Sequence, residues 1–359
     1  MDDWEVPSSS PPRAKRGGLK GGLYYSTTLH SRTQYKTCPT IITKKTHPCV
    51  NQIAFLSTAR HNVFVMATQK IMIDAAKCTG CGECVADCPN SVLAVAEEGK
   101  IIVAKPETCI QCCHCAAVCP VDAVTLPAYD PGNFPLLQAE PLIGYNDLIS
   151  LLRRRRSIRR YIHETVPREV VEQLIEAARY APTGSNSQGC RYIVVEGFDA
   201  VRSISGTMIN YYVGLAKMMN TPWGRVALRL AIGGKAYPGF KRYLPFIWDS
   251  TKKYDAGGDP VFRGAPLLIG IYIGPGSFTA HDDCIIAMCH MLMAAETLGL
   301  GSCLNGFLTI SAARSKDIRD AMGVPEDHKL YAAAAFGYPD VKYRRAVDRF
   351  KPDIAWLER

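Results

Sequence analysis

Two identical cysteine runs constrain the fold more than any other feature of this 359-residue sequence. Each run reads Cys-x-x-Cys-x-x-Cys-x-x-x-Cys-Pro. The eight cysteines are Cys78, Cys81, Cys84 and Cys88 in the first run, and Cys109, Cys112, Cys115 and Cys119 in the second. The second run begins 31 residues after the first. The segment is therefore an internal repeat, which predicts a small module with pseudo-two-fold symmetry.

The spacing of these thiols indicates iron–sulfur ligation. The two-residue gaps let one tight loop supply three thiolates to a cubane cluster, and the cysteine beside each proline ligates the other cluster. We expect two [4Fe–4S] clusters with these ligand sets: Cys78, Cys81, Cys84 and Cys119, and Cys109, Cys112, Cys115 and Cys88. Zinc is the less suitable alternative, because it usually joins two distant Cys-x-x-Cys pairs. Disulfides would require an oxidising compartment.

The segment around these runs resembles the two-cluster bacterial ferredoxins over residues 68–128, and no ligand is missing. We expect the domain to span residues 66–128. Its predicted strands are Ile71–Ile73, Val92–Val95, Ile101–Val103 and Ala123–Leu126, the middle two forming a hairpin around Glu98-Gly99. Cys113 breaks the spacing and is interpreted as a neighbour of the cluster. His114 is interpreted as a loop residue, because all eight cysteine ligands are present.

Residues 1–65 differ in composition from the rest of the chain. They are rich in Ser, Thr, Pro, Gly and Lys, and they carry +6 of the formal net charge of +9. We expect them to be mostly disordered. They are interpreted as an extension ahead of a start at Met66 or as an organelle transit peptide, which Asp2, Asp3 and Glu5 disfavour. The remaining +3 is weak ground for a nucleic-acid partner, so none is expected.

The sequence contains no apolar run of about eighteen residues, the length that a helix needs to span a bilayer. No membrane span is therefore predicted. Cysteines in a metal-ligand spacing also indicate a reducing compartment. Together these features predict a cytoplasmic protein.

A second domain is expected over residues 146–359, after a linker at residues 129–145 that Pro131, Pro135 and Pro141 stiffen. A helix should begin at Asn146 or Asp147. The other predicted helices are the one after Pro167, Asp282–Leu298 and Ile310–Met322, and the predicted strands are Arg191–Val195, Leu267–Ile273 and Leu330–Phe336. This mixture predicts an α+β domain with a central mixed or antiparallel sheet flanked by helices.

Two polar segments of this domain have the character of a binding site. Alternation would place Arg155, Ser157 and Arg159 on one side of an extended stretch, where two guanidiniums and a hydroxyl suit a phosphate. A solvated basic run or an RNA-binding arm is the alternative. The loop Ala181–Gln188 is small and polar, so its backbone can approach a flat ring closely.

Four separated motifs over residues 146–359 together resemble the nitroreductase family. They are Arg-Arg-Ser-Ile-Arg at 155–159, Ala-Pro-Thr-Gly-Ser-Asn-Ser-Gln at 181–188, Gly-Leu-Gly-Ser-Cys-Leu-Asn-Gly-Phe at 299–307, and Gly-Tyr-Pro at 337–339 with a basic stretch through Arg349. The resemblance implies bound FMN and a homodimer with flavins at the interface. It implies these flavin-site residues: Arg155, Arg156, Ser157 and Arg159; Pro182, Thr183, Gly184 and Asn186 from the partner subunit; Leu304, Asn305 and Gly306 near flavin N5; and Arg349.

A flavin and iron–sulfur clusters on one chain predict an electron-transfer route, because clusters carry one electron each and flavins carry one or two. One hypothesis is an FMN-dependent oxidoreductase that reduces a nitro compound, quinone or conjugated carbonyl. The other is a component that relays electrons between a redox partner, such as ferredoxin, and another carrier. No Gly-x-Gly-x-x-Gly follows a strand, so no separate dinucleotide-binding domain is expected. NAD(P)H is still a candidate donor, because the resemblance to nitroreductases implies that it could bind directly over FMN. The aromatic-rich residues 201–260 are interpreted as core helices or as a lid over the flavin.

Overall fold

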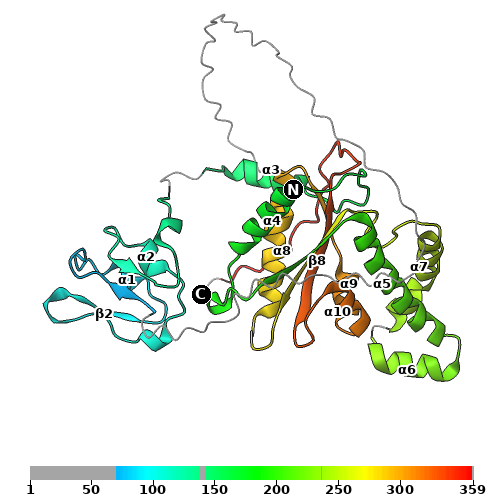
Figure 1. Cartoon of the computed structure of the whole chain (residues 1–359), viewed down its shortest axis with the longest axis horizontal. Helices are drawn as coiled ribbons and strands as arrows, with labels where there is room; N and C mark the ends of the chain where they lie inside the picture. The colour runs from blue at the N-terminus through cyan, green and yellow to red at the C-terminus, as the bar shows by residue number, and fades with distance from the viewer. Residues whose placement is uncertain (1–69, 138–141, 236, 358–359) are drawn as a thin grey trace, which may run out of the picture. The chain divides into compact units, whose positions relative to one another are not determined.

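The computed structural model describes residues 70–137, 142–235 and 237–357 (Figure 1). The expectations for residues 1–65 lie outside the described residues. In the described part of the chain, no helix combines the length and the apolar character that crossing a membrane would require.

The ferredoxin-type module is built from two short antiparallel pairs. Strand β1 (Met72–Ile73) pairs with β4 (Val124–Thr125), and β2 (Leu93–Val95) pairs with β3 (Ile101–Val103). Its short helices are α1 (Glu83–Ala86) and α2 (His114–Ala117). The predicted strand positions and hairpin are confirmed. The apolar core consists mainly of Ile71, Val92, Leu93, Ile101, Val124 and Leu126.

The two cysteine runs have the same backbone conformation before their short helices. Gly82 precedes α1 and Cys113 precedes α2, and both are left-handed, with φ of 81° and 65°. Glycine adopts this conformation without a steric penalty, whereas cysteine does not. Cys113 therefore occupies the turn position that Gly82 has in the first run, at a steric cost that glycine does not have.

The second domain is centred on one antiparallel sheet with strand order β5-β6-β8-β7. The strands are β5 (Arg191–Glu196), β6 (Leu267–Ile273), β7 (Gly301–Leu304) and β8 (Lys329–Gly337). The three predicted strands are confirmed, as is the α+β class, while β7 was not predicted. The alanine run 332–335 of β8 keeps side chains small where helices cover both faces of the sheet.

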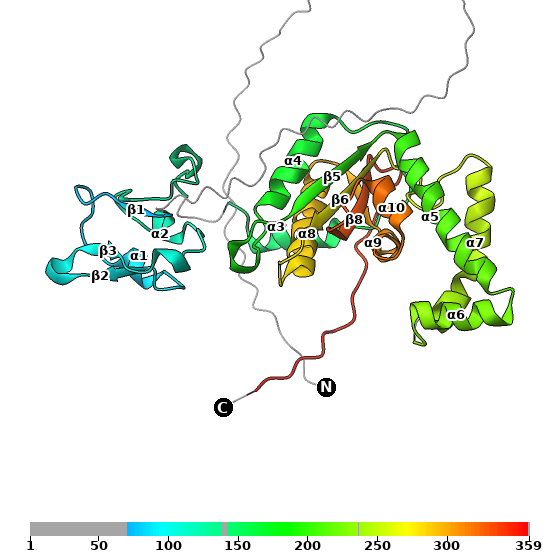
Figure 2. The same cartoon turned by 60° about the horizontal axis from the view of Figure 1, so that its bottom comes forward.

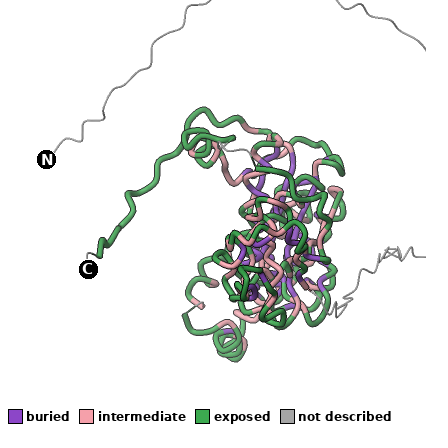
Figure 3. The backbone as a smooth tube through the Cα atoms, turned by 90° about the vertical axis from the view of Figure 1, so that its left-hand side faces the viewer, coloured by how far each residue is buried: buried purple, intermediate pink, exposed green. Residues whose placement is uncertain are grey.

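Helices cover both faces of this sheet (Figure 2). On one face α4 (Arg168–Arg179) and α8 (Ala280–Thr297) pack on Leu267, Ile269 and Ile271 of β6. On the other face α5 (Phe198–Met218), α9 (Gly306–Ala312) and α10 (Lys316–Met322) pack around Leu268. The period-two alternation of a strand explains this division of β6 between two cores. The buried residues come accordingly from the sheet and from the helices packed on it. Figure 3 shows them in the interior of the folded part, with exposed residues around them.

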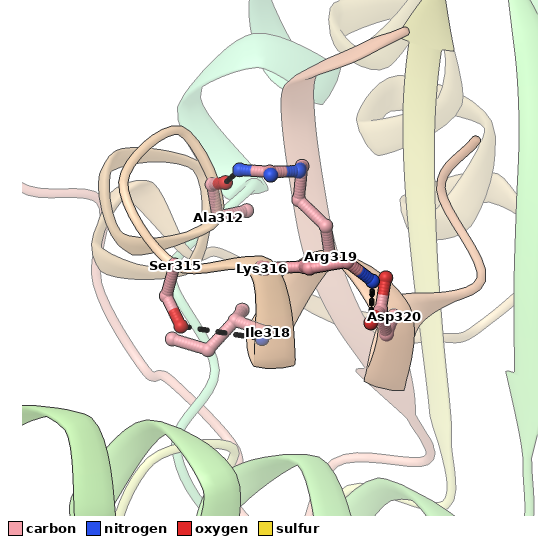
Figure 4. A network of polar contacts seen from close by, with 6 residues as sticks. All are labelled: Ala312, Ser315, Lys316, Ile318, Arg319 and Asp320. Atoms are coloured by element: carbon pink, nitrogen blue, oxygen red, sulfur yellow. Dashed lines mark hydrogen bonds and ion pairs between the residues drawn. The ribbon is translucent and has the colours of Figure 1, made fainter. Parts of the chain in front are cut away.

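Two helix predictions need correction. The helix predicted at Ile310–Met322 is two helices, α9 and α10, because Ser315 is extended and its Oγ accepts a hydrogen bond from the N–H of Ile318 at 3.4 Å. A serine cap begins a helix, and here it outweighs the apolar pattern that runs through both segments. Figure 4 shows this cap, the Lys316–Asp320 ion pair and the bond from Arg319 to the Ala312 carbonyl. Helix α3 (Tyr145–Arg154) begins after Gly144 rather than at Asn146 or Asp147.

Residues 201–260 form more helix than the two core helices proposed for them. Besides α5 they contain α6 (Pro222–Ile232) and α7 (Tyr237–Asp255). Helix α5 buries seven of its 21 residues, whereas the 19-residue α7 buries only Ile247 and Ser250. Helix α5 therefore contributes to the core, whereas α7 lies mostly at the surface and can line a cavity.

Candidate functional site

Each predicted set of four thiols surrounds its own small cavity. One cavity is lined by Cys78, Cys81, Cys84 and Cys119, together with apolar neighbours such as Ile73 and Val124. The other is lined by Cys109, Cys112, Cys115 and Cys88, and also by Cys113, with Ile71 and Leu126 nearby. The structure thus places the fourth cysteine of each run with the first three of the other run.

Backbone amides point at the sulfur atoms. The N–H groups of Val92 and Ala123 donate to the Sγ atoms of Cys88 and Cys119, both at 3.2 Å. Such donors stabilise thiolates bound to iron. In the described residues, no three His, Cys, Asp or Glu side chains converge on a single-ion site. Four thiols around one cavity, with a backbone N–H donor to one sulfur, are ligands of the kind that an iron–sulfur cluster takes.

The arginine run is held against the sheet by its backbone. Ser157 forms a parallel bridge with Ser302 of β7, and the N–H of Ile158 donates to the Ser302 carbonyl at 2.9 Å. Ile158 is buried and meets Gly301, where a Cβ would overlap its side chain. This fixed backbone carries Arg155, Arg156 and Ser157, all half-buried, and leaves Arg159 exposed.

A cavity of about 480 Å³ begins where this segment meets β7. Arg159, Leu304, Asn305 and Gly306 line it, so four of the predicted flavin residues are brought together. The Oδ1 of Asn305 accepts the N–H of Leu308 at 2.9 Å and so caps α9. The rest of the wall is mostly apolar and aromatic, and comes from Met208, Ile209, Tyr212, Phe240, Tyr243, Phe246, Ile247, Phe262, Phe307 and Ile310.

A buried carboxylate holds the loop Ala181–Gln188. Asp283, at the start of α8, is 2 % exposed. Its Oδ1 accepts the N–H of Gly184 at 2.9 Å, and its Oδ2 accepts the hydroxyls of Ser187 at 3.3 Å and Thr279 at 3.1 Å. A Cβ at Gly184 would overlap the Thr279 side chain, so glycine is required there. Asp283 belongs to none of the motifs recognised in the sequence. An acidic residue within an otherwise apolar helix was the available signal.

The same loop is conformationally strained. Ser185, Asn186 and Gln188 all have positive φ, between 46° and 52°. Left-handed backbone costs non-glycine residues free energy and recurs at ligand-binding loops. The bonds to Asp283 offset part of that cost, and the N–H of Gln188 also donates to Thr183 Oγ1 at 3.0 Å.

Removal of the Asp283 carboxylate should release this loop. We expect Asp283→Ala to lower the free energy of unfolding by about 1–3 kcal/mol, because a buried N–H and two hydroxyls lose their acceptor. Limited proteolysis should also cut within residues 181–188 faster than in the wild type. Urea denaturation and mass mapping of the fragments measure both effects. The control is Asp282→Ala, whose side chain is 76% exposed. Equal stability of the two variants would contradict this role for Asp283.

Asn186 lies against the second cysteine loop. Its Nδ2 donates to the carbonyl oxygen of Gln111 at 2.9 Å and to that of Ile110 at 3.3 Å. The Tyr129 hydroxyl donates to the same Gln111 carbonyl at 3.0 Å and receives a bond from Gln188 Nε2 at 2.8 Å. Gln111 directly precedes Cys112. A predicted flavin-loop residue therefore contacts the peptide of a predicted cluster ligand.

The structure does not bring all the predicted flavin residues together. Pro182, Thr183, Gly184 and Asn186 are outside the lining of the 480 Å³ cavity, and the resemblance assigned them to the flavin of the partner subunit. Arg155, Arg156 and Ser157 do not line the cavity either, although Arg159 of the same segment does. Arg349 is exposed in the irregular segment after β8 and is also outside the lining. Their roles at the flavin remain predictions.

The comparisons with known proteins decide the family. Residues 152–338, just over half of the chain, match the model of the nitroreductase family. The chain belongs to the nitroreductase family. Residues 70–120 match the model described as a 4Fe-4S dicluster domain. The predicted fusion of a nitroreductase domain to a ferredoxin-type domain is thereby confirmed, and with it the oxidoreductase class.

Individual relatives match one part of this nitroreductase-family chain each. A protein of Archaeoglobus fulgidus, with the provisional name NADH dehydrogenase/NAD(P)H nitroreductase, is 24% identical over 59% of this chain and 98% of its own length. A ferredoxin of Methanothermococcus thermolithotrophicus is 43% identical over 16% of this chain and 95% of its own. A solved nitroreductase from Bacteroides fragilis with bound FMN is 20% identical, covers 58% of this chain and 99% of its own, and has a TM-score of 0.44.

Proposed function

We propose that this protein is an iron–sulfur flavoprotein that passes electrons between two [4Fe–4S] clusters and FMN and reduces a small organic acceptor. The candidate acceptors are a nitro compound, a quinone or a conjugated carbonyl. The observation that carries this choice is the 480 Å³ cavity beside Arg159, Asn305 and Gly306. A pure relay protein needs only an exposed flavin edge, whereas ligand pockets are concave and mostly apolar.

The residues at the cavity and in the adjoining segment 155–159 fit FMN. Arg155 and Arg159 would hold the phosphate and ribityl chain, because guanidiniums form forked, charge-assisted bonds to phosphate. Gly306 leaves the backbone accessible, since a Cβ there would meet no atom within 4 Å. Bound FMN would accept electrons singly or in pairs and transfer them as a hydride. Arg349 and the partner's copy of the Pro182–Asn186 loop would complete the site in a homodimer.

The thiol sets fit two clusters, and one of them lies beside the flavin loop. The bond from Asn186 to the Gln111 carbonyl supports an electron route from the Cys109 loop to the flavin. The division into an extension (1–65), a ferredoxin-type domain (66–128), a linker (129–145) and a flavin domain (146–359) is part of this proposal. A short linker would keep the iron–sulfur clusters and the flavin at a high effective concentration relative to each other. Ferredoxin or another redox protein is the proposed donor, and NAD(P)H is the alternative.

Anaerobic turnover with different donors tests this function. Reduced ferredoxin, NADH and NADPH would be compared side by side with a nitroaromatic and a quinone as acceptors. We expect reduced ferredoxin to support steady reduction of at least one acceptor by the protein carrying both cofactors. Reduction of a second carrier protein with no turnover of any organic acceptor would instead identify a relay component.

A further inference from the structure

Helix α6 is well defined but buries little of itself. Thr221 caps it by accepting the N–H of Gly224 at 3.0 Å, and Gly233 ends it with a φ of 86°. Of its eleven described residues only Leu228 is buried, although α5 and α7 lie next to it. The helix therefore leaves most of its surface to solvent.

The exposed apolar residues of α6 follow the helical period. Trp223, Val226 and Leu230 stand at positions i, i+3 and i+7, so they share one face of the helix, which we call the apolar stripe. Trp223 and Leu230 are 84% and 79% exposed. An amphipathic helix normally turns such a stripe toward the core, whereas the buried Leu228 of α6 lies on a different face. A contiguous exposed apolar face of this kind marks an interaction site.

The chain around the apolar stripe is strongly basic. Residues 217–248, from the end of α5 through most of α7, contain no Asp or Glu and six Lys or Arg, all exposed: Lys217, Arg225, Arg229, Lys235, Lys241 and Arg242. Residues 66–359 carry +3 in total, so without this stretch of +6 they carry −3. Positive charge is therefore concentrated beside the stripe, which favours an anionic partner.

We propose that the apolar stripe and the cations around it bind the surface of an anionic lipid bilayer. Helices that lie in the headgroup region combine Trp and Leu on one face with Lys and Arg beside them. Trp favours this region because its ring is apolar and its N–H is polar, and acidic headgroups attract the cations. With eleven residues, α6 is too short to cross a bilayer and would lie on it. The stripe is outside the cavity lining, so this inference does not rest on the proposed acceptor.

Other occupants fit this surface less well. A second copy docked stripe to stripe would bring like charges together, and residues 1–65 of this chain are basic as well. From Trp223 to Leu230 the stripe spans only about 11 Å of helix. A stable protein interface buries about 800 Å² on each partner, whereas a bilayer needs no complementary shape.

Sedimentation with vesicles tests the proposal on the full-length protein carrying its cofactors. Vesicles of phosphatidylcholine mixed with phosphatidylglycerol would be compared with vesicles of phosphatidylcholine alone at several salt concentrations. We expect binding to the mixed vesicles, weakening as salt rises, and little binding to phosphatidylcholine alone. Trp223→Ala combined with Leu230→Ala should weaken binding about tenfold or more, because the stripe is lost while every charge is kept.

Trp356→Ala combined with Leu357→Ala is the matched control. These residues are 83% and 87% exposed and lie outside α6, so this variant should bind as the wild type does. Equal binding of the α6 variant and the wild type would overturn the proposal, as would wild-type protein that does not bind the mixed vesicles. A loss of dimer in the α6 variant by light scattering would place a second copy on the stripe instead. Capture of an acidic ferredoxin without vesicle binding would identify a protein partner.

Discussion

Replacement of both Cys81 and Cys112 by serine should abolish ferredoxin-driven reduction of the acceptor while FMN stays bound. Each substitution removes one of the four thiols around a cavity, so both clusters are impaired. Arg155, Ser157 and Arg159 are untouched. We expect the rate with reduced ferredoxin to fall by about a hundredfold or more, because single-electron delivery depends on the clusters. Any direct NAD(P)H-driven rate should persist.

Metal and flavin analysis of the same samples gives this test its control. The wild type should contain about eight iron and eight sulfide per chain after anaerobic reconstitution, and the double variant much less. The matched variant is Cys113→Ser, because Cys113 lies in the same loop but its Sγ donates to the Gln111 carbonyl at 3.4 Å. This variant should keep its iron and its rate. Ferredoxin-driven turnover at the wild-type rate in the Cys81/Cys112 double variant would refute an electron route through the clusters.

The two cysteine runs show which parts of the fold are readable from sequence. Three thiols of each set lie within seven residues, from Cys78 to Cys84 and from Cys109 to Cys115. Their grouping is therefore a local property. The fourth cysteine could be assigned because the run is duplicated, and the structure places Cys88 and Cys119 accordingly. The strands β5, β6 and β8 were predicted for a similar local reason, since each is a short apolar run.

What the sequence did not show depends on distant or competing contacts. Strand β7 has only four residues, Gly301–Leu304, and is strand because it pairs with β8. The break between α9 and α10 depends on one serine cap that apolar periodicity obscures. Asp283 bonds to Gly184, 99 residues earlier, and no local pattern marks that pairing.

The second large effect is expected at Arg159, the arginine of the 155–159 motif that lines the cavity. Arg159→Glu should leave the protein folded but unable to retain FMN. The substitution removes charge-assisted bonds and places a carboxylate near the flavin phosphate, so two unfavourable changes act on the same ligand. We expect the dissociation constant for FMN to rise by about a hundredfold or more, and the protein to elute from gel filtration without flavin absorbance.

Two further variants distinguish the loss of a phosphate contact at Arg159 from a general effect of the protein's net charge on FMN binding. Arg153→Glu makes the same change in net charge on α3, where Arg153 is exposed and outside the cavity lining. It should keep its FMN, because Arg153 makes no contact with the cavity and salt weakens the interaction of exposed charges. Arg159→Lys should recover part of the affinity, since it restores the charge without the forked donors. Cluster content should match the wild type in all three variants, because the thiols are unchanged. Full FMN occupancy in Arg159→Glu would place the phosphate site elsewhere on this chain.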